Sequence, residues 1–127
     1  MTSLTYTAVQ PLILSTTGIQ TNAFLPTTGV EYKRGDLLAL SAAGVLTHST
    51  DAADFHVIAL DDVSVEQATK HAADGIGIPV YTQVDANLDA VMVNGTALTE
   101  EQKTAARAHA VLNTSLTLRS PAKTEGA

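Results

Sequence analysis

Residues 32–63, YKRGDLLALSAAGVLTHSTDAADFHVIALDDV, contain three short apolar runs, at 37–40, 45–48 and 55–60. Turns rich in Gly, Ser and Asp separate these runs from one another. Short segments of Val, Ile and Leu with this punctuation are typical of antiparallel strands joined by tight turns. We therefore predict three strands here, and we expect them to hold the core of the domain.

The composition limits the kind of protein that this chain can be. Its 127 residues suffice for one domain that buries roughly two thirds of its unfolded surface. Cysteine is absent, so neither a disulfide framework nor a thiolate metal site is available. Apolar residues make up 45% but aromatics only 4%, so we expect a core of Ala, Val and Leu. The net charge is -6 and no basic cluster exceeds Lys33–Arg34, so nucleic acid is not an expected partner.

The sequence also bears on location. No run approaches the roughly 20 apolar residues that span a bilayer, so no membrane partner is expected. The N-terminus has neither a cationic start nor an A-x-A cleavage site, so it does not fit the pattern of a signal peptide. We expect a soluble protein that is synthesised in the cytoplasm.

Residues 1–31 differ in composition from the rest of the chain. Eight of the first 28 residues are threonines, and no charged residue occurs before Glu31. Two interpretations are open. The segment can pack along its own domain as an edge strand, or it can be an extended arm that pairs with a strand of another subunit by β-augmentation.

The middle of the chain predicts one loop and one strand. Residues 63–74 lack an apolar stripe, which favours a solvent-facing loop over a helix. Residues 75–84 alternate with the period of a half-buried strand. Pro79 cannot donate to a ladder, so we expect this strand at an edge or with a bulge there. The face that carries Gly77, Pro79 and Tyr81 is expected to be flat and outward.

The C-terminal third predicts a hairpin, a helix and a last strand. Asn94-Gly95 is a strong two-residue hairpin signal. Thr99 to Gln102 form a capping box that opens a helix from residue 100 to about 110, with Asn113 as a C-cap. Residues 115–119 alternate as a strand, and the polar residues 120–127 form a tail.

Groups that could carry catalysis are few. His48, Asp51, Asp54 and His56 fall within nine positions and could be interpreted as a metal site. Their spacing is that of a surface loop, so we expect solvated loop residues rather than metal ligands. No set of nucleophile, base and oxyanion donors is apparent, so we predict no enzyme and no cofactor. The alternatives are a small β-barrel metal-dependent hydrolase that uses these four residues, or a ligand-binding module at the Asn94-Gly95 hairpin.

The order of motifs from Lys33 to about Arg119 resembles that of the phage lambda-type head decoration proteins. The resemblance rests on RGDLLAL and GVLT within residues 34–47, on HVIALDDV at 56–63, and on PVYTQVDANLDAVMV at 79–93. A single helix opened by a Thr-Glu-Glu box and a closing strand follow in the same order. The start of the chain, with Tyr6 and Gln10-Pro11, also resembles the arm of that family.

The resemblance implies a structural protein without an active site. Members form homotrimers on the outer surface of the mature phage head, at local threefold axes, and their N-terminal arms order against the major capsid protein. They stabilise the shell against the pressure of packaged DNA. For this chain it implies an α+β, mainly β, small barrel-like or tulip-like domain at 32–119 with one helix, an extended arm at 1–31 and a flexible tail at 120–127.

From the composition of the arm we predict which residues would contact the capsid. They are Thr5, Tyr6, Thr7, Val9, Leu12 and Ile13. The flat face around Pro79 and Tyr81 is the expected trimer interface.

Overall fold

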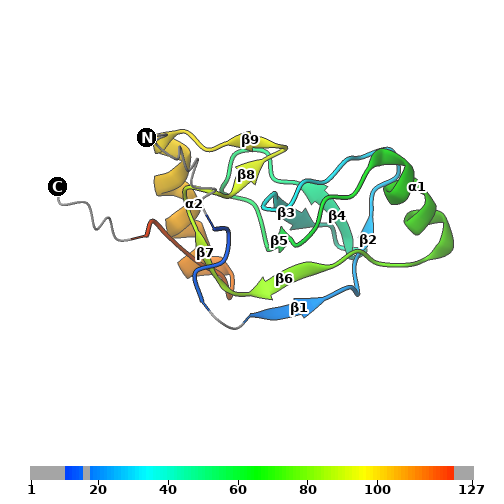
Figure 1. The fold of residues 1–127 in the computed structure, drawn as a ribbon, viewed down its shortest axis with the longest axis horizontal. Coiled ribbons are helices and arrows are strands. Elements are labelled where there is room, and N and C mark those ends of the chain that lie inside the picture. The colour runs from blue at the N-terminus through cyan, green and yellow to red at the C-terminus, as the bar shows by residue number, and fades with distance from the viewer. Residues whose placement is uncertain (1–10, 16–17, 122–127) are drawn as a thin grey trace, which may run out of the picture.

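A mixed six-stranded sheet runs through the middle of the protein (Figure 1). The computed structural model describes residues 11–15 and 18–121. The strands lie in the order β1-β6-β5-β3-β4-β2. Their bounds are β1 (Ile19–Thr21), β2 (Leu25–Pro26), β3 (Leu37–Leu40), β4 (Val45–His48), β5 (Val57–Ala59) and β6 (Val80–Gln83). Within this sheet only β2 and β4 are parallel neighbours. The three strands predicted in residues 32–63 are confirmed as β3, β4 and β5.

Two small sheets and two helices complete the α+β fold. The short strands are β7 (Asp85–Asn87), β8 (Met92–Val93), β9 (Thr96–Ala97) and β10 (Thr117–Arg119), and the helices are α1 (Val65–Asp74) and α2 (Glu100–Asn113). β7 pairs in parallel with β10, and β8 with β9 as a hairpin. Within the described ranges the strands close no barrel, because the two end strands of the large sheet, β1 and β2, do not pair with each other. The expectation of a barrel-like domain with one helix is therefore corrected to an open sheet with two helices.

Each face of the large sheet packs against its own core. Leu37, Ile58 and Tyr81 are cross-strand neighbours and belong to the first core. The residues next to them, Leu38, Val57 and Val80, belong to the second core, as the alternation of side chains along a strand requires. The first core includes Leu12, Phe55, Ala86, Leu88, Val91, Leu98, Ala106, Ala110, Leu116 and Leu118, and the second includes Tyr32, Leu46, Ala59, Val63, Ala68 and Ile78.

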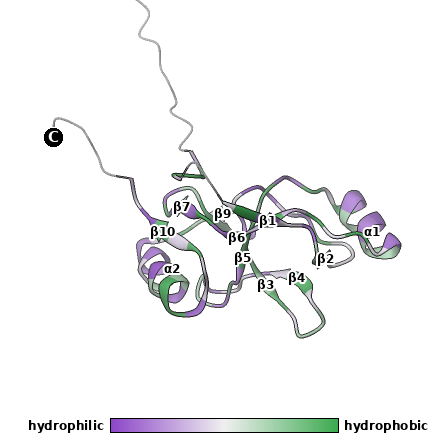
Figure 2. Ribbon diagram, turned by 90° about the horizontal axis from the view of Figure 1, so that it is seen from below, coloured by the Kyte–Doolittle hydropathy of each residue, from purple (hydrophilic) through white to green (hydrophobic). Residues whose placement is uncertain are grey.

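The helices pack against different cores and lie at opposite ends of the molecule (Figures 1 and 2). Ala106 and Ala110 of α2 enter the first core, and Ala68 of α1 enters the second. Because each helix contributes only alanines to its core, the helix backbones can lie close to the layer beneath them. The expectation of a core rich in small aliphatic residues agrees with this packing.

Helix α1 replaces the loop that we predicted for residues 63–74. Ser64 accepts from the Gln67 N–H at 3.1 Å, and the Gln67 side chain accepts from the Ser64 N–H at 3.0 Å. Gly75 ends the helix with φ +70°. The loop prediction was wrong because it rested on the missing apolar stripe, whereas reciprocal capping and one buried residue, Ala68, accompany a helix here.

Strand β6 lies inside the sheet, between β1 and β5, so the prediction of an edge strand was wrong. The ladder with β1 is irregular, but the register shifts opposite Ile19 and Gln20 and not at Pro79, where the alternative prediction placed a bulge. β1, from the N-terminal region, provides the outer strand instead. Pro79 precedes the ladder, where its missing N–H costs nothing, and its carbonyl accepts from the Leu60 N–H at 3.3 Å. Tyr81 is buried in the first core at 8% exposure, so the predicted outward face is not formed.

The C-terminal predictions hold with small shifts. Asn94 and Gly95 turn the β8–β9 hairpin with φ +49° and +76°. The Thr99–Gln102 capping box is present, and α2 extends to Asn113, with Thr114 rather than Asn113 as its C-cap.

The described part of the predicted arm packs on its own chain. Leu12 is buried in the first core, and Ile13 bridges Ala86. β1 and β2 occupy the two ends of the large sheet. The edge-strand interpretation therefore applies to these residues, whereas Thr5, Tyr6, Thr7 and Val9 lie outside the described residues.

Candidate functional site

The four residues that could be interpreted as metal ligands form separate hydrogen bonds within their own surroundings. His48 Nε2 donates to the Glu31 carbonyl at 2.6 Å, and His56 Nδ1 accepts from the Leu40 N–H at 3.1 Å. Asp51 accepts from the Ala53 N–H at 3.0 Å. The structure therefore does not bring them together, and among residues 11–15 and 18–121 no three His, Asp or Glu side chains are grouped so as to hold a metal ion.

Asp54 organises the loop between β4 and β5. Its carboxylate accepts from the Ser49 hydroxyl and from the Thr50 hydroxyl, the latter at 2.8 Å. Burial raises the pKa of the Asp54 carboxyl, but these hydroxyl groups and the backbone N–H groups of Thr50 and Asp51 outweigh it and lower that pKa below its usual value. The charged carboxylate thus acts as the cap of its own loop.

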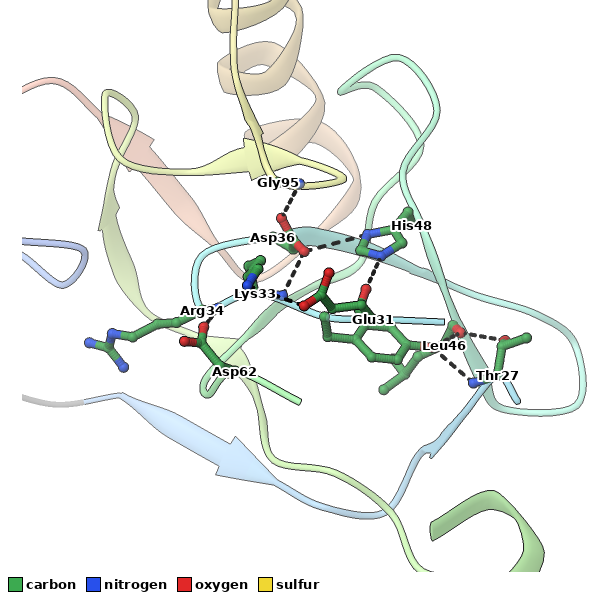
Figure 3. A network of polar contacts seen from close by, with 10 residues as sticks. Thr27, Glu31, Lys33, Arg34, Asp36, Leu46, His48, Asp62 and Gly95 are labelled. Carbon is green, nitrogen blue, oxygen red and sulfur yellow. Dashed lines mark hydrogen bonds and ion pairs between the residues drawn. The ribbon is translucent and has the colours of Figure 1, made fainter. Parts of the chain in front are cut away.

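A buried polar network surrounds Asp36 (Figure 3). The carboxylate accepts from the Lys33 N–H and from the Gly95 N–H, each at 2.8 Å, and His48 Nδ1 lies 3.6 Å from it. Asp36 therefore joins the turn before β3, the tip of the β8–β9 hairpin and the end of β4. Since His48 Nε2 donates to the Glu31 carbonyl, both ring nitrogens of His48 face groups of the domain itself.

Tyr32 extends this network into the second core. Its ring stacks on His48 with centroids 5.2 Å apart, and its hydroxyl donates to the Leu46 carbonyl at 2.8 Å. Burial raises the pKa of Tyr32, while hydrogen bonds with Thr27 act in the opposite direction. The contacts of the Asp36 network are those of a structural brace.

The two ends of the large sheet differ in a way that bears on assembly. At β2, Pro26 lacks a donor, and α1 packs beside the strand, where the Gly29 N–H donates to Thr69 Oγ1 at 3.1 Å. At the other end, β1 has β6 on one side and no further strand on the other among the residues described (Figure 1). Proteins protect such an edge with charged residues, short strands or bulges; residues 1–30 carry no charge, and β1 is three residues long with a register shift between Ile19 and Gln20. The β1 edge is thus the open side of the sheet.

The open side is longer than β1 itself. The Leu14 N–H donates to the Asp85 carbonyl at 2.8 Å, and the Asn87 N–H to the Leu12 carbonyl at 2.8 Å. Residues 12–14 and 19–21 therefore both run antiparallel to residues 80–87 and form two paired stretches of one edge. A groove of about 400 Å³ lies beside them; its lining includes Ser15, Gly18, Ile19, Gln83, Ser115 and Thr117.

The predicted interface residues fall in different environments. Leu12 is 8% exposed and Ile13 is half-buried, so both side chains are engaged by their own domain. Tyr81 is buried and Pro79 is half-buried beside β1.

The exposed pair Val111 and Leu112 was not among the residues predicted from the sequence. Both lie on α2, which buries Ala106 and Ala110. The sequence could have indicated their exposure, because Val111 and Leu112 do not lie on the face of the helix that Ala106 and Ala110 bury.

Comparison with known protein families found none that matches the chain, and a search of curated proteins found no significantly similar relative. The resemblance to head decoration proteins therefore rests on the motifs quoted above. The described helices include none with the length and apolar character needed to cross a bilayer.

Proposed function

We propose that this protein is a capsid decoration protein, which binds the outside of a mature phage head as a homotrimer and stabilises the shell. The observation that carries the proposal is the absence of charge from residues 1–30, of which Ile19–Thr21 form the end strand β1 of the large sheet. The order of motifs from Lys33 to Arg119 supports it independently. The open sheet with two covered faces would be this chain's form of the family's tulip-like domain.

The proposed mechanism is backbone pairing. An extended segment offers one N–H and one C=O at each residue, and strand addition uses them without requiring charge complementarity. Thr5, Tyr6, Thr7 and Val9 would pair with a strand of the major capsid protein, and Leu12 and Ile13 would hold the base of the arm against β7. Many copies on one shell add by multivalency, so each contact can be weak.

The test is a truncation that removes the arm but keeps the residues that pack in the domain. Removal of residues 2–10 keeps the described contacts of Leu12 and Ile13, whereas removal of residues 2–14 would also take Leu12 out of the first core. We expect the 2–10 deletion to fold, as judged by circular dichroism, and to lose binding to expanded heads that lack the protein. Deletion of residues 122–127 is the matched control and should leave binding intact.

A 2–10 deletion that saturates heads as the full chain does would overturn the role of the arm. The copy number in purified particles tests the assembly itself. A ratio near one copy per major capsid protein fits one trimer at each local threefold axis, and absence from particles would overturn the proposed function.

A further inference from the structure

We propose that Asn94 is a site of deamidation and that the Asp36 carboxylate keeps its side-chain amide intact in the folded protein. Asn94 and Gly95 form the tip of the β8–β9 hairpin, and the Gly95 N–H donates to Asp36 Oδ1 at 2.8 Å (Figure 3). The proposal concerns the chemical durability of the domain and does not depend on the proposed function.

The Asn94-Gly95 dipeptide is chemically reactive when the chain is unconstrained, and the sequence contains no second Asn-Gly pair. The backbone nitrogen of Gly95 loses its proton and attacks Cγ of Asn94. A succinimide ring closes, the Cγ–Nδ2 bond breaks, and the side-chain nitrogen takes up a proton and leaves as ammonia. Water then opens the ring at either carbonyl, which gives aspartate or isoaspartate. Glycine favours the attack because it has no Cβ atom to hinder the approach.

The turn is open to solvent. Asn94, Gly95 and Thr96 are all exposed. Outside the turn itself, the nearest described atom to a Cβ built on Gly95 is Lys33 Cγ, at 3.8 Å. Water and hydroxide can therefore reach the reacting atoms, and protection of Asn94 has to come from the bonds that hold the turn.

Asp36 opposes the first step of the reaction, the loss of the Gly95 proton. The Asp36 side chain is 1% exposed, and each of its oxygens accepts from one backbone N–H, Oδ2 from Lys33 and Oδ1 from Gly95. A deprotonated Gly95 nitrogen would be an anion beside a buried carboxylate, and like charges in a poorly solvated site repel strongly. The carboxylate therefore favours the protonated, unreactive form of this amide.

The hairpin opposes the second step, the closure of the ring. Asn94 and Gly95 have φ +49° and +76°, as a tight two-residue hairpin turn requires, and the Val93–Thr96 pair holds the strands on either side. To reach Asn94 Cγ, the Gly95 nitrogen has to turn about the Cα–C bond of Asn94. This rotation would break the hydrogen bond to Asp36, so the reaction has to wait until the hairpin opens.

The product of the reaction would weaken the network that delays it. Isoaspartate adds a methylene group to the main chain, so a turn built for two residues no longer closes in the same register. The Gly95 N–H would then leave Asp36, and a buried carboxylate that loses a donor is destabilising. Deamidation should therefore loosen the contact between the hairpin and the turn before β3, and the loss of ammonia makes the change irreversible.

The experiment follows residue 94 by peptide mapping and mass spectrometry during incubation in mildly alkaline buffer. We compare the folded full chain with a synthetic peptide of residues 90–99. The folded chain should form aspartate and isoaspartate at position 94 at least about tenfold more slowly than the peptide, because only the open hairpin reacts. Equal rates in the folded chain and the peptide would overturn the proposal.

Asp36→Asn tests the role of the charge. The variant keeps the shape of the side chain and removes the negative charge beside Gly95, so Asn94 should react faster than in the wild type. Ser64→Ala is the matched control: it weakens the cap of α1 without touching the hairpin, and Asn94 should react in it at the wild-type rate. An Asp36→Asn variant that reacts at the wild-type rate or more slowly would overturn the protective role of Asp36.

A series of urea concentrations below the unfolding transition needs no variant, and it decides the question if Asp36→Asn does not fold. Base-catalysed hydrogen exchange of the Gly95 N–H passes through the same amide anion. Exchange of this N–H and deamidation of Asn94 should therefore rise together as urea opens the hairpin. A Gly95 N–H that exchanges as fast as in the peptide, or deamidation that stays constant while exchange rises, would each overturn the proposal.

Discussion

Gly77 lies against the backbone of residues 22–24, with no room for a side chain. A Cβ atom at this position would lie 1.9 Å from the Asn22 carbonyl oxygen and 2.8 Å from that of Phe24. The approach is needed because the Ile78 N–H donates to the Phe24 carbonyl at 3.1 Å, which ties the segment before β6 to the segment before β2. Glycine at 77 thus lets the N-terminal region lie against the sheet.

Gly77→Ala should therefore destabilise the protein by about 3 kcal/mol or more, since backbone atoms and not a flexible side chain would have to move. Urea denaturation measures the free energy of unfolding. Gly44→Ala is the control: nothing lies within 4 Å of its Cβ position, and only its φ of +78° is unfavourable, at a cost of about 1 kcal/mol. Equal losses for the two variants would contradict the steric account.

The Asp54 cap predicts a dependence of stability on pH. Because the pKa of Asp54 is lowered in the folded protein, its contribution is present above the pKa of the unfolded chain, near 3.9, and is lost as the pH falls through the folded pKa. Asp54→Asn should therefore be less stable than the wild type at pH 7, and the difference should shrink below about pH 4. A difference that stays constant from pH 7 to pH 3 would argue against the cap.

At the scale of the element, α1 has hydrogen-bonded caps at both ends but little buried surface between them. The Ser64–Gln67 capping box and the Gly75 C-cap satisfy terminal backbone groups. Only Ala68 is buried, so burial contributes little to this helix. The stability of α1 should thus depend strongly on its caps.

Ser64→Ala should cost about 1 kcal/mol in the free energy of unfolding, because the Gln67 N–H loses its acceptor. Ser64→Asp keeps an acceptor and should restore most of the loss. Hydrogen exchange should show faster opening of α1 in the alanine variant, while α2 exchanges at the wild-type rate. Ser64→Ala and Ser64→Asp of equal stability would show that the cap is dispensable.

At the scale of the whole molecule, the N-terminal region is part of the fold and, in the proposed function, the route to partners. Leu12 fills the first core, Ile13 bridges β7, and β1 extends the large sheet. In the proposed function the arm would therefore end near Pro11, well before the residue 31 expected from composition.

Leu12→Ala should destabilise the protein by about 2–4 kcal/mol, as expected for a large-to-small change at a core position. Leu112→Ala is the matched control: Leu112 is 77% exposed, and its loss should change stability by less than about 0.5 kcal/mol. Thermal and urea denaturation would both report the difference. A Leu12→Ala variant as stable as Leu112→Ala would show that residues 11–15 do not hold to the domain.

Local signals in the chain were sufficient for much of the fold. The three runs in residues 32–63, the Asn94-Gly95 turn and the Thr99 capping box act through backbone geometry within a few residues of themselves, so the sequence alone predicted their structures. The absence of charge in residues 1–30 is also a property of the sequence alone, and it motivates the proposed role in assembly.

The tertiary structure decided which of these elements became neighbours. The alternating pattern of residues 75–84 cannot reveal whether another strand covers its edge, and here β1, about 60 positions away in the chain, does so and leaves β1 itself as the open edge. Nor could the pattern show that Tyr81 and Val80 face different cores, because two covered faces arise only when segments from distant parts of the chain pack on both sides of one sheet. Burial of this kind is a property of long-range contacts, which no local pattern contains.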